Sequence, residues 1–250
     1  MTARLEVWDG GKLSEVASAT LPGGVGGKGA PKVLAMDAAL SGEAPLVAVA
    51  ASERRLLVYD LRALSKPLHD RASPLKMATR AVRLVGGEKL VVGSLEGRVA
   101  VDLLAEPDAE DRGAGKKYVS YAFKCHRVSA EEGAMDESEG TAVALGASGE
   151  TISPVHALAA HPSQSRCVAS GGGDGHAACW DVDAKRRLWL SGAYPAGVVG
   201  LDWAADGGCL AVVTSEAVEG GAANAGDSGR GRVYVRDMAA SEYTPRPKKR

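Results

Sequence analysis

The sequence predicts an all-β protein assembled from a series of small sheets. Three observations predict it: short apolar segments recur along the chain, turn residues bound them, and no window shows a sustained helical period with capping residues. The segments are too short for helices and are rich in Val and Leu, as strands are. In chain order they are residues 5–8, 46–50, 56–59, 89–92, 98–103, 155–160, 166–169, 176–180, 210–213 and 232–235.

Several of these segments end on an acidic residue, and the spacing of these ends gives the length of a repeat. Asp60 and Asp102, for example, are 42 residues apart. Repeats of about 40–45 residues are typical of the four-stranded blades of a β-propeller. The other intervals are longer and require insertions, for which the chain offers segments rich in glycine, in acidic residues or in small residues: 23–29, 129–153 and 218–230.

The most complete repeat spans residues 155–190. It reads as a strand, a His161-Pro162 turn, a second strand, a GGGDG turn, a third strand that ends on Trp180-Asp181, and a final strand. This order resembles a blade of the WD-repeat family. The resemblance implies structural roles for Asp174, which would join the turn to the neighbouring unit by hydrogen bonds, for Trp180, which would pack between blades, and for Asp181.

We expect residues 1–250 to form a single WD-repeat β-propeller domain. The first segment resembles the third strand of a blade, and a closed propeller of about seven blades needs roughly 280–315 residues. The chain is therefore expected to lack its N-terminal blades and to expose sheet faces and edges. The expected parts are a partial blade at 1–22, blades at roughly 30–66, 74–127, 153–190 and 196–238, and a basic tail at 239–250.

Composition and charge exclude several function classes. Lys and Arg number 30 and Asp and Glu 31, so the chain lacks the broad basic excess of a nucleic-acid binder, and we expect no direct DNA binding. No segment approaches the roughly 18 apolar residues that span a membrane, so no membrane partner is expected. The four cysteines have no metal-ligand spacing, and we expect neither a metal nor another cofactor.

Three patterns resemble chemical motifs but lack the surroundings that the chemistry requires. Residues 24–29 match GxGxxG, yet a proline and a strand follow where a dinucleotide site needs a helix. His161 and Ser228 resemble parts of a serine protease, but both lie in predicted turns or loops. Cys125 and His126 are adjacent, and neighbours on one strand point to opposite faces, so they cannot share a proton. We therefore expect no enzyme.

Two segments carry a narrower resemblance: residues 93–103, GSLEGRVAVDL, and residues 116–127, KKYVSYAFKCHR. Together they resemble a family of WD-repeat proteins with two branches, mitotic checkpoint proteins of the Bub three type and messenger-RNA export factors of the Rae/Gle type. The features that favour the checkpoint branch are YDLRALSKP at 59–67, KRRL at 185–188 and AYP at 193–195. Those that favour the export branch are SPLK at 73–76, WDVDAK at 180–185 and PRPKKR at 245–250.

The resemblance implies a protein that works by binding. A propeller face would hold an acidic GLEBS-type peptide from a Bub-type checkpoint kinase. In the checkpoint branch it would also bind phosphorylated threonine motifs of a kinetochore scaffold, which places the protein in the nucleus and, in mitosis, at kinetochores. The export branch would bind a GLEBS motif of a nucleoporin instead.

Three basic residues are the candidate peptide-binding or phosphopeptide-binding site. Arg98 follows a glycine in a hairpin turn, where its guanidinium can bind a carboxylate through two hydrogen bonds. Lys124 and Arg127 are expected on the next strand and on opposite faces of it, unless a bulge intervenes. The alternative is that Arg98 and Arg127 form structural salt bridges between blades. The terminal RPKKR is either a nuclear-import patch or a tail that keeps the terminus solvated.

Overall fold

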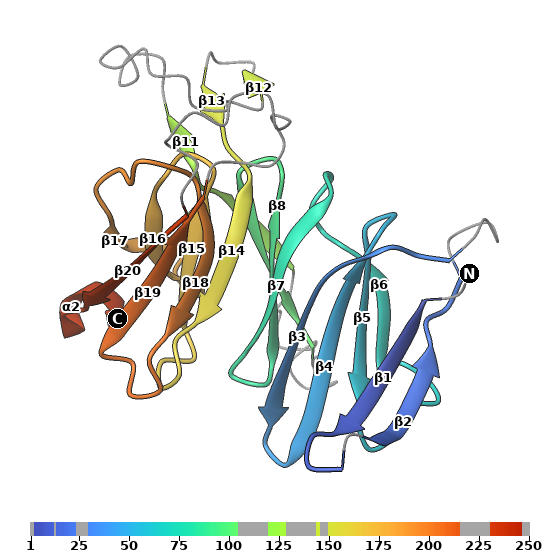
Figure 1. Ribbon diagram of the computed structural model, residues 1–250. Coiled ribbons are helices and arrows are strands. Elements are labelled where there is room, and N and C mark those ends of the chain that lie inside the picture. Colours follow the sequence, from blue (N-terminus) through green and yellow to red (C-terminus); the bar gives the residue numbers. More distant parts are fainter. Residues whose placement is uncertain are drawn as a thin grey trace, which may run out of the picture.

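The computed structural model describes residues 3–12, 14–23, 30–104, 120–128, 144–145, 150–215 and 231–246. Within these ranges the chain forms consecutive antiparallel sheets that stand side by side along an arc (Figure 1). The all-β prediction is confirmed, and the sheets are blades of a WD-repeat β-propeller. Helix α2 (Ala240–Tyr243) is a single turn, too short to leave a periodic pattern in the sequence.

Three of the sheets have four strands, and each is a meander in which every strand pairs with the next. Every apolar segment named above falls on a strand, to within one residue. The four-stranded sheets are β3 (Val33–Ser41), β4 (Ala44–Ala51), β5 (Arg55–Asp60) and β6 (His69–Ala72); β7 (Thr79–Val85), β8 (Lys89–Ser94), β9 (Arg98–Leu103) and β10 (Tyr121–Lys124); and β14 (Val155–Ala160), β15 (Cys167–Gly172), β16 (Ala177–Asp181) and β17 (Arg186–Leu190).

The remaining sheets are smaller. A two-stranded sheet stands at the N-terminal end of the arc, a three-stranded sheet at the C-terminal end, and a small sheet lies between β10 and β14 in the sequence (Figure 1). Their strands are β1 (Arg4–Asp9) and β2 (Ser14–Thr20); β18 (Val198–Trp203), β19 (Cys209–Thr214) and β20 (Arg232–Asp237); and β11 (Arg127–Val128), β12 (Ala144–Leu145) and β13 (Thr151–Ile152).

The core is divided among the spaces between successive sheets. The first strands β3, β7, β14 and β18 contact one another in turn, so each sheet presents its face to the next. Small and β-branched side chains such as Ala48, Val92, Val168 and Val212 fill these spaces. Only 4% of the residues are aromatic, so few bulky side chains are available to fill the core. The sheets therefore pack closely, and small side chains are sufficient to exclude water.

Two strands near the ends of the arc leave apolar side chains in solvent. Met36 and Leu40 of β3 are 53% and 71% exposed, and Val233 and Val235 of β20 are 69% and 72% exposed. Residues of the β1–β2 sheet pack on the same face of the β3–β6 sheet at β4 and β5, and the exposed side chains of β3 show that this cover does not extend over them. No helix among the described residues is long and apolar enough to cross a membrane.

Several sequence predictions fall on residues that the structure does not describe. They are the GxGxxG segment at 24–29, most of the acidic insertion at 129–153, the insertion at 218–230 with its Ser228, the lysine pair that opens KKYVSYAFKCHR, and the last four residues of the basic tail.

Candidate functional site

A tight turn between β8 and β9 sets the position of the candidate site. Gly97 in this turn has a φ of +57°, which favours glycine. A Cβ there would lie 2.8 Å from the carbonyl oxygen of Cys125 and 3.1 Å from that of Ser153. The Cys125 amide donates to the Gly97 carbonyl at 3.0 Å. The turn therefore packs directly against the chain that follows β10, and this brings Arg98 beside the end of that strand.

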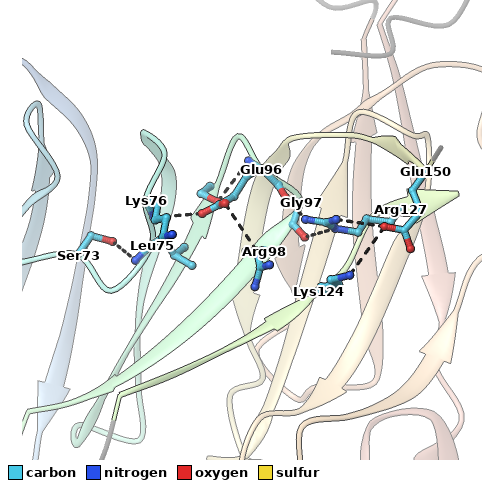
Figure 2. A network of polar contacts seen from close by, with 10 residues as sticks. Ser73, Leu75, Lys76, Glu96, Gly97, Arg98, Lys124, Arg127 and Glu150 are labelled. Carbon is cyan, nitrogen blue, oxygen red and sulfur yellow. Dashed lines mark hydrogen bonds and ion pairs between the residues drawn. The ribbon is translucent and has the colours of Figure 1, made fainter. Parts of the chain in front are cut away.

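Arg98 and Lys124 are direct partners in the pairing of β9 with β10. Directly opposed residues of an antiparallel pair point to the same face, and like charges placed this way destabilise a sheet. Their side chains are 35% and 58% exposed. Arg98 Nε lies 3.6 Å from the Glu96 carboxylate, and Lys124 Nζ lies 3.8 Å from that of Glu150 (Figure 2).

The expectation that Lys124 and Arg127 share one strand and point to opposite faces is wrong. Strand β10 ends at Lys124, and Arg127 begins β11, which pairs with β13. Between them His126 has a left-handed φ of +50°, so the chain changes direction. As a result the Arg127 guanidinium reaches Glu150 at 3.3 Å, the same carboxylate that faces Lys124 (Figure 2).

Arg127 is the most enclosed of the three basic side chains, with 13% of it exposed. Its Nη2 donates to the Glu96 carbonyl at 2.9 Å, and its Nε donates to the Gly97 carbonyl at 3.5 Å. These bonds tie the β8–β9 turn to the start of β11. Arg127 is therefore a positioning residue for Arg98, whereas Arg98 and Lys124 keep their charged groups toward solvent.

The carboxylate of Glu96 is held from the other side. Its Oε1 accepts a hydrogen bond from the Lys76 amide at 3.1 Å, and the Glu96 backbone amide donates to the Ser94 hydroxyl at 3.3 Å.

The three cations Arg98, Lys124 and Arg127 and the two carboxylates of Glu96 and Glu150 thus meet at one end of the β7–β10 sheet. Their formal charges leave an excess of one positive charge, which suits an acidic ligand.

A buried chain of hydrogen bonds joins this region to the next sheet. His126 Nδ1 lies 2.9 Å from Asp174 in the β15–β16 turn, and His126 Nε2 lies 2.8 Å from the Ser170 hydroxyl. The Trp180 indole N–H donates to the same hydroxyl at 2.8 Å. Burial works to raise the pKa of Asp174, but its hydrogen bonds and charge interactions with His126 and with His176 together outweigh burial and leave that pKa below its ordinary value.

The sequence did not indicate that His126 and Ser170 take part in these buried hydrogen bonds; His126 was considered only as a neighbour of Cys125. Neither Cys125 nor His126 lies on a strand, so the argument that neighbours on a strand point to opposite faces does not apply to them. The Cys125 thiol is buried, which raises its pKa and keeps it protonated at neutral pH. The usable signal was a histidine at the end of one predicted blade and a serine before the GGGDG turn of the next.

Trp180 and Asp181 close strand β16, and both make structural contacts. The Trp180 ring is buried between sheets, 5.0 Å between centroids from the Phe123 ring of β10. The Asp181 carboxylate pairs with Arg166 at 2.6 Å and accepts the amides of Asp183 and Ala184, both at 3.1 Å. Asp181 therefore fixes the turn between β16 and β17.

The remaining motif, His161, has its ring nitrogens engaged with the backbone. Nδ1 accepts the amides of Ser163 and Gln164 at 3.2 Å, and Nε2 lies 3.2 Å from the Gly207 carbonyl. Its ring also stacks on Tyr243 of α2 at 4.5 Å. The described cysteines are free thiols, and no three potential metal ligands gather within the described part of the chain.

Comparison with known proteins gives consistent relatives, although no protein-family model matches the chain. "Mitotic checkpoint protein BUB3.1" of Arabidopsis thaliana is 34% identical over 201 residues, which are 80% of this chain and 52% of that protein. "Mitotic checkpoint protein bub-3" of Caenorhabditis elegans is 36% identical over 170 residues, 68% of this chain and 43% of that protein. "mRNA export factor" of Danio rerio is 29% identical over 211 residues, 82% of this chain and 51% of that protein.

The resemblance expected from the sequence is confirmed by these relatives, of which the two checkpoint proteins are 34% and 36% identical and the export factor is 29% identical. The chain spans about half the length of the relatives it matches.

Proposed function

We propose that this chain, a relative of Bub3-type mitotic checkpoint proteins, is a non-catalytic propeller scaffold of the spindle assembly checkpoint. It would bind GLEBS-type peptides of Bub kinases and phosphorylated threonine motifs of a kinetochore scaffold. By holding both it would recruit the kinases to kinetochores in mitosis, and the protein itself would be located in the nucleus and, in mitosis, at kinetochores.

The observation that carries the proposal is the direct opposition of Arg98 and Lys124 on one exposed face. Two like charges placed opposite each other on a sheet repel and so destabilise it. A bound ligand with two neighbouring negative charges would relieve this repulsion. Two glutamates of a peptide or the dianion of a phosphothreonine provide such charge, and the guanidinium can bind either with two hydrogen bonds.

The first test is peptide binding by the Arg98→Glu variant, measured by fluorescence anisotropy with a labelled GLEBS-type peptide. Binding should be lost while the circular dichroism spectrum stays unchanged. Arg62→Glu is the matched control, because the Arg62 side chain is 59% exposed and lies in the turn after β5, in a different blade. If Arg98→Glu binds the peptide as well as Arg62→Glu does, the assignment of the site is wrong.

The second candidate function is that of an mRNA export factor, which would bind a nucleoporin GLEBS motif at the nuclear pore. The export-factor relatives favour it. Peptide binding does not separate the two candidates, since both use GLEBS motifs. Location does, because an export factor should concentrate at the nuclear rim in interphase.

Affinity purification of the tagged chain from mitotic cells provides a further separation. Bub-type kinases with a kinetochore scaffold would support the checkpoint role. A nucleoporin with export factors would support the second candidate. Recovery of chaperones alone would contradict both roles for this chain by itself.

A further inference from the structure

The two exposed cations of the candidate site are already faced by carboxylates of the same chain, and the contacts are long. Glu96 lies 3.6 Å from Arg98, and Glu150 lies 3.8 Å from Lys124. Elsewhere in the protein, Arg166 and Asp181 approach to 2.6 Å. Charge-assisted hydrogen bonds have lengths of roughly 2.7–2.9 Å. The site therefore neutralises its cations without closing tight bonds on them.

The two carboxylates differ in how firmly they are held. Glu96 accepts the Lys76 amide at 3.1 Å and sits in the turn that Arg127 ties down. Glu150 lies at the opposite side of the cluster, just before β13, and faces both Lys124 and Arg127 (Figure 2). Besides Glu150, Arg127 has two backbone partners, the carbonyls of Glu96 and Gly97. Glu150 lies closer to Arg127, at 3.3 Å, than to Lys124, at 3.8 Å, so its contact with Lys124 is the looser of the two and the one that a ligand can replace.

We propose that Glu150 is an internal competitor, which must leave Lys124 before an acidic peptide can bind there. The inference rests on the proposed function, because it concerns the regulation of the same site. An incoming carboxylate that simply replaces Glu150 gains little, since Lys124 exchanges one anion for another. Net affinity then depends on a second negative charge that reaches Arg98. Glu150 thereby makes the site selective for ligands that engage both cations together.

Competition makes a prediction that simple repulsion does not. A competitor lowers the affinity of every ligand that binds Lys124 by the same factor, because each ligand must break the same contact between Glu150 and Lys124. Repulsion by a fixed negative charge instead grows with the charge of the ligand, so a phosphopeptide would feel it more than an unphosphorylated acidic peptide.

The experiment measures the affinity of two peptides, an acidic GLEBS-type peptide and a phosphothreonine peptide, for the wild-type protein and for Glu150→Gln. Competition predicts that both peptides bind more tightly to the variant by a similar factor of about three to five, in keeping with an exposed ion pair. Glu88→Gln is the control, because Glu88 is exposed in the β7–β8 turn at the other end of the same sheet.

A second variant tests the route. In a Lys124→Gln background, Glu150→Gln should have no further effect if it acts through Lys124. A gain that persists without Lys124, or that is larger for the phosphopeptide, would overturn competition in favour of repulsion. A gain no greater than that of Glu88→Gln would overturn it outright.

The outcomes also separate this inference from the proposed function. If the wild-type protein binds and Glu150→Gln changes nothing, only the competitor role fails. If no variant binds either peptide, the proposed function fails and the inference fails with it. Binding that appears only in Glu150→Gln would support competition, with Glu150 blocking the site in the free protein.

Discussion

The imidazole of His126 lies 2.9 Å from the Asp174 carboxylate, although 48 residues separate the two along the chain. His126 follows the last strand of one sheet, and Asp174 lies in a turn of the next. Both side chains are almost completely buried. The contact therefore joins two blades through polar groups that have left water, and its loss would leave one of them unsatisfied.

Asp174→Ala should lower the free energy of unfolding by about 1–3 kcal/mol, because it leaves Nδ1 of the buried His126 ring without its hydrogen-bond partner, while Nε2 keeps its contact with Ser170. Urea denaturation measures the change. Asp206→Ala is the control. Asp174 accepts the His176 amide in its turn at 3.2 Å, and Asp206 likewise accepts the Gly208 amide at 2.8 Å, but Asp206 is exposed. Its change should stay within about 0.5 kcal/mol. Equal losses in both variants would show that the bond to His126 contributes nothing beyond the turn.

Gly97→Ala should destabilise the protein more than Gly42→Ala. Both glycines have positive φ, +57° and +56°, so both variants carry a left-handed strain of about 1–2 kcal/mol. Only at Gly97 would the new Cβ meet backbone atoms, whereas at Gly42 nothing lies within 4 Å. Thermal unfolding of the two variants isolates the clash, and similar melting temperatures would contradict the close packing of the β8–β9 turn.

Arg127 and Arg98 should separate in their effects on stability. Arg127→Ala removes charged hydrogen bonds to two backbone carbonyls and should cost about 1.5–3 kcal/mol of unfolding free energy. Arg98→Ala removes one exposed ion pair with Glu96 and should change it by less than about 1 kcal/mol. Chemical denaturation compares the two variants. The reverse order would exclude Arg127 as the positioning residue.

Stability should fall as the pH drops below about 6.5, in part through His161. Burial lowers the pKa of His161 below its ordinary value, and the bond to the Gly207 carbonyl offsets this only in part. The unfolded chain then takes up a proton at a higher pH than the folded one, so the contribution is complete above the ordinary pKa and is lost as the pH falls through the folded pKa.

The measurement is the unfolding free energy of the wild type and of His161→Gln between pH 8 and pH 5. The variant should be less stable at pH 8 and should lose less stability on acidification. An unchanged pH dependence in the variant would assign the acid sensitivity to other groups.

The strands were predictable because their signals are local. A short apolar segment bounded by turn residues, such as 155–160, specifies a strand without knowledge of its neighbours. Placing Arg98 directly after a turn glycine was possible for the same reason. The resemblance to WD-repeat blades drew attention to Trp180 and Asp181, whose contacts with Phe123 and Arg166 are not encoded in spacing.

The break after Lys124 was not predictable in this way. The sequence predicts Lys124 and Arg127 on one strand, and nothing local marks the left-handed conformation of His126 between them. That conformation accompanies bonds to Ser170 and Asp174, which lie 44 and 48 residues further along the chain. The convergence of Lys124 and Arg127 on Glu150 depends on the same break. Contacts of this range become visible only in three dimensions.

His126 follows the β7–β10 sheet in the chain but makes its hydrogen bonds to the β14–β17 sheet. A segment exchanged between related proteins should therefore begin before His126 and not at the first strand of the β14–β17 sheet. A chimaera joined at the start of β14 would leave the imidazole behind and place an unmatched Asp174 in its new surroundings. A junction placed before Cys125 would carry the imidazole, the hydroxyl of Ser170 and the indole of Trp180 together, and should give the better-folded hybrid.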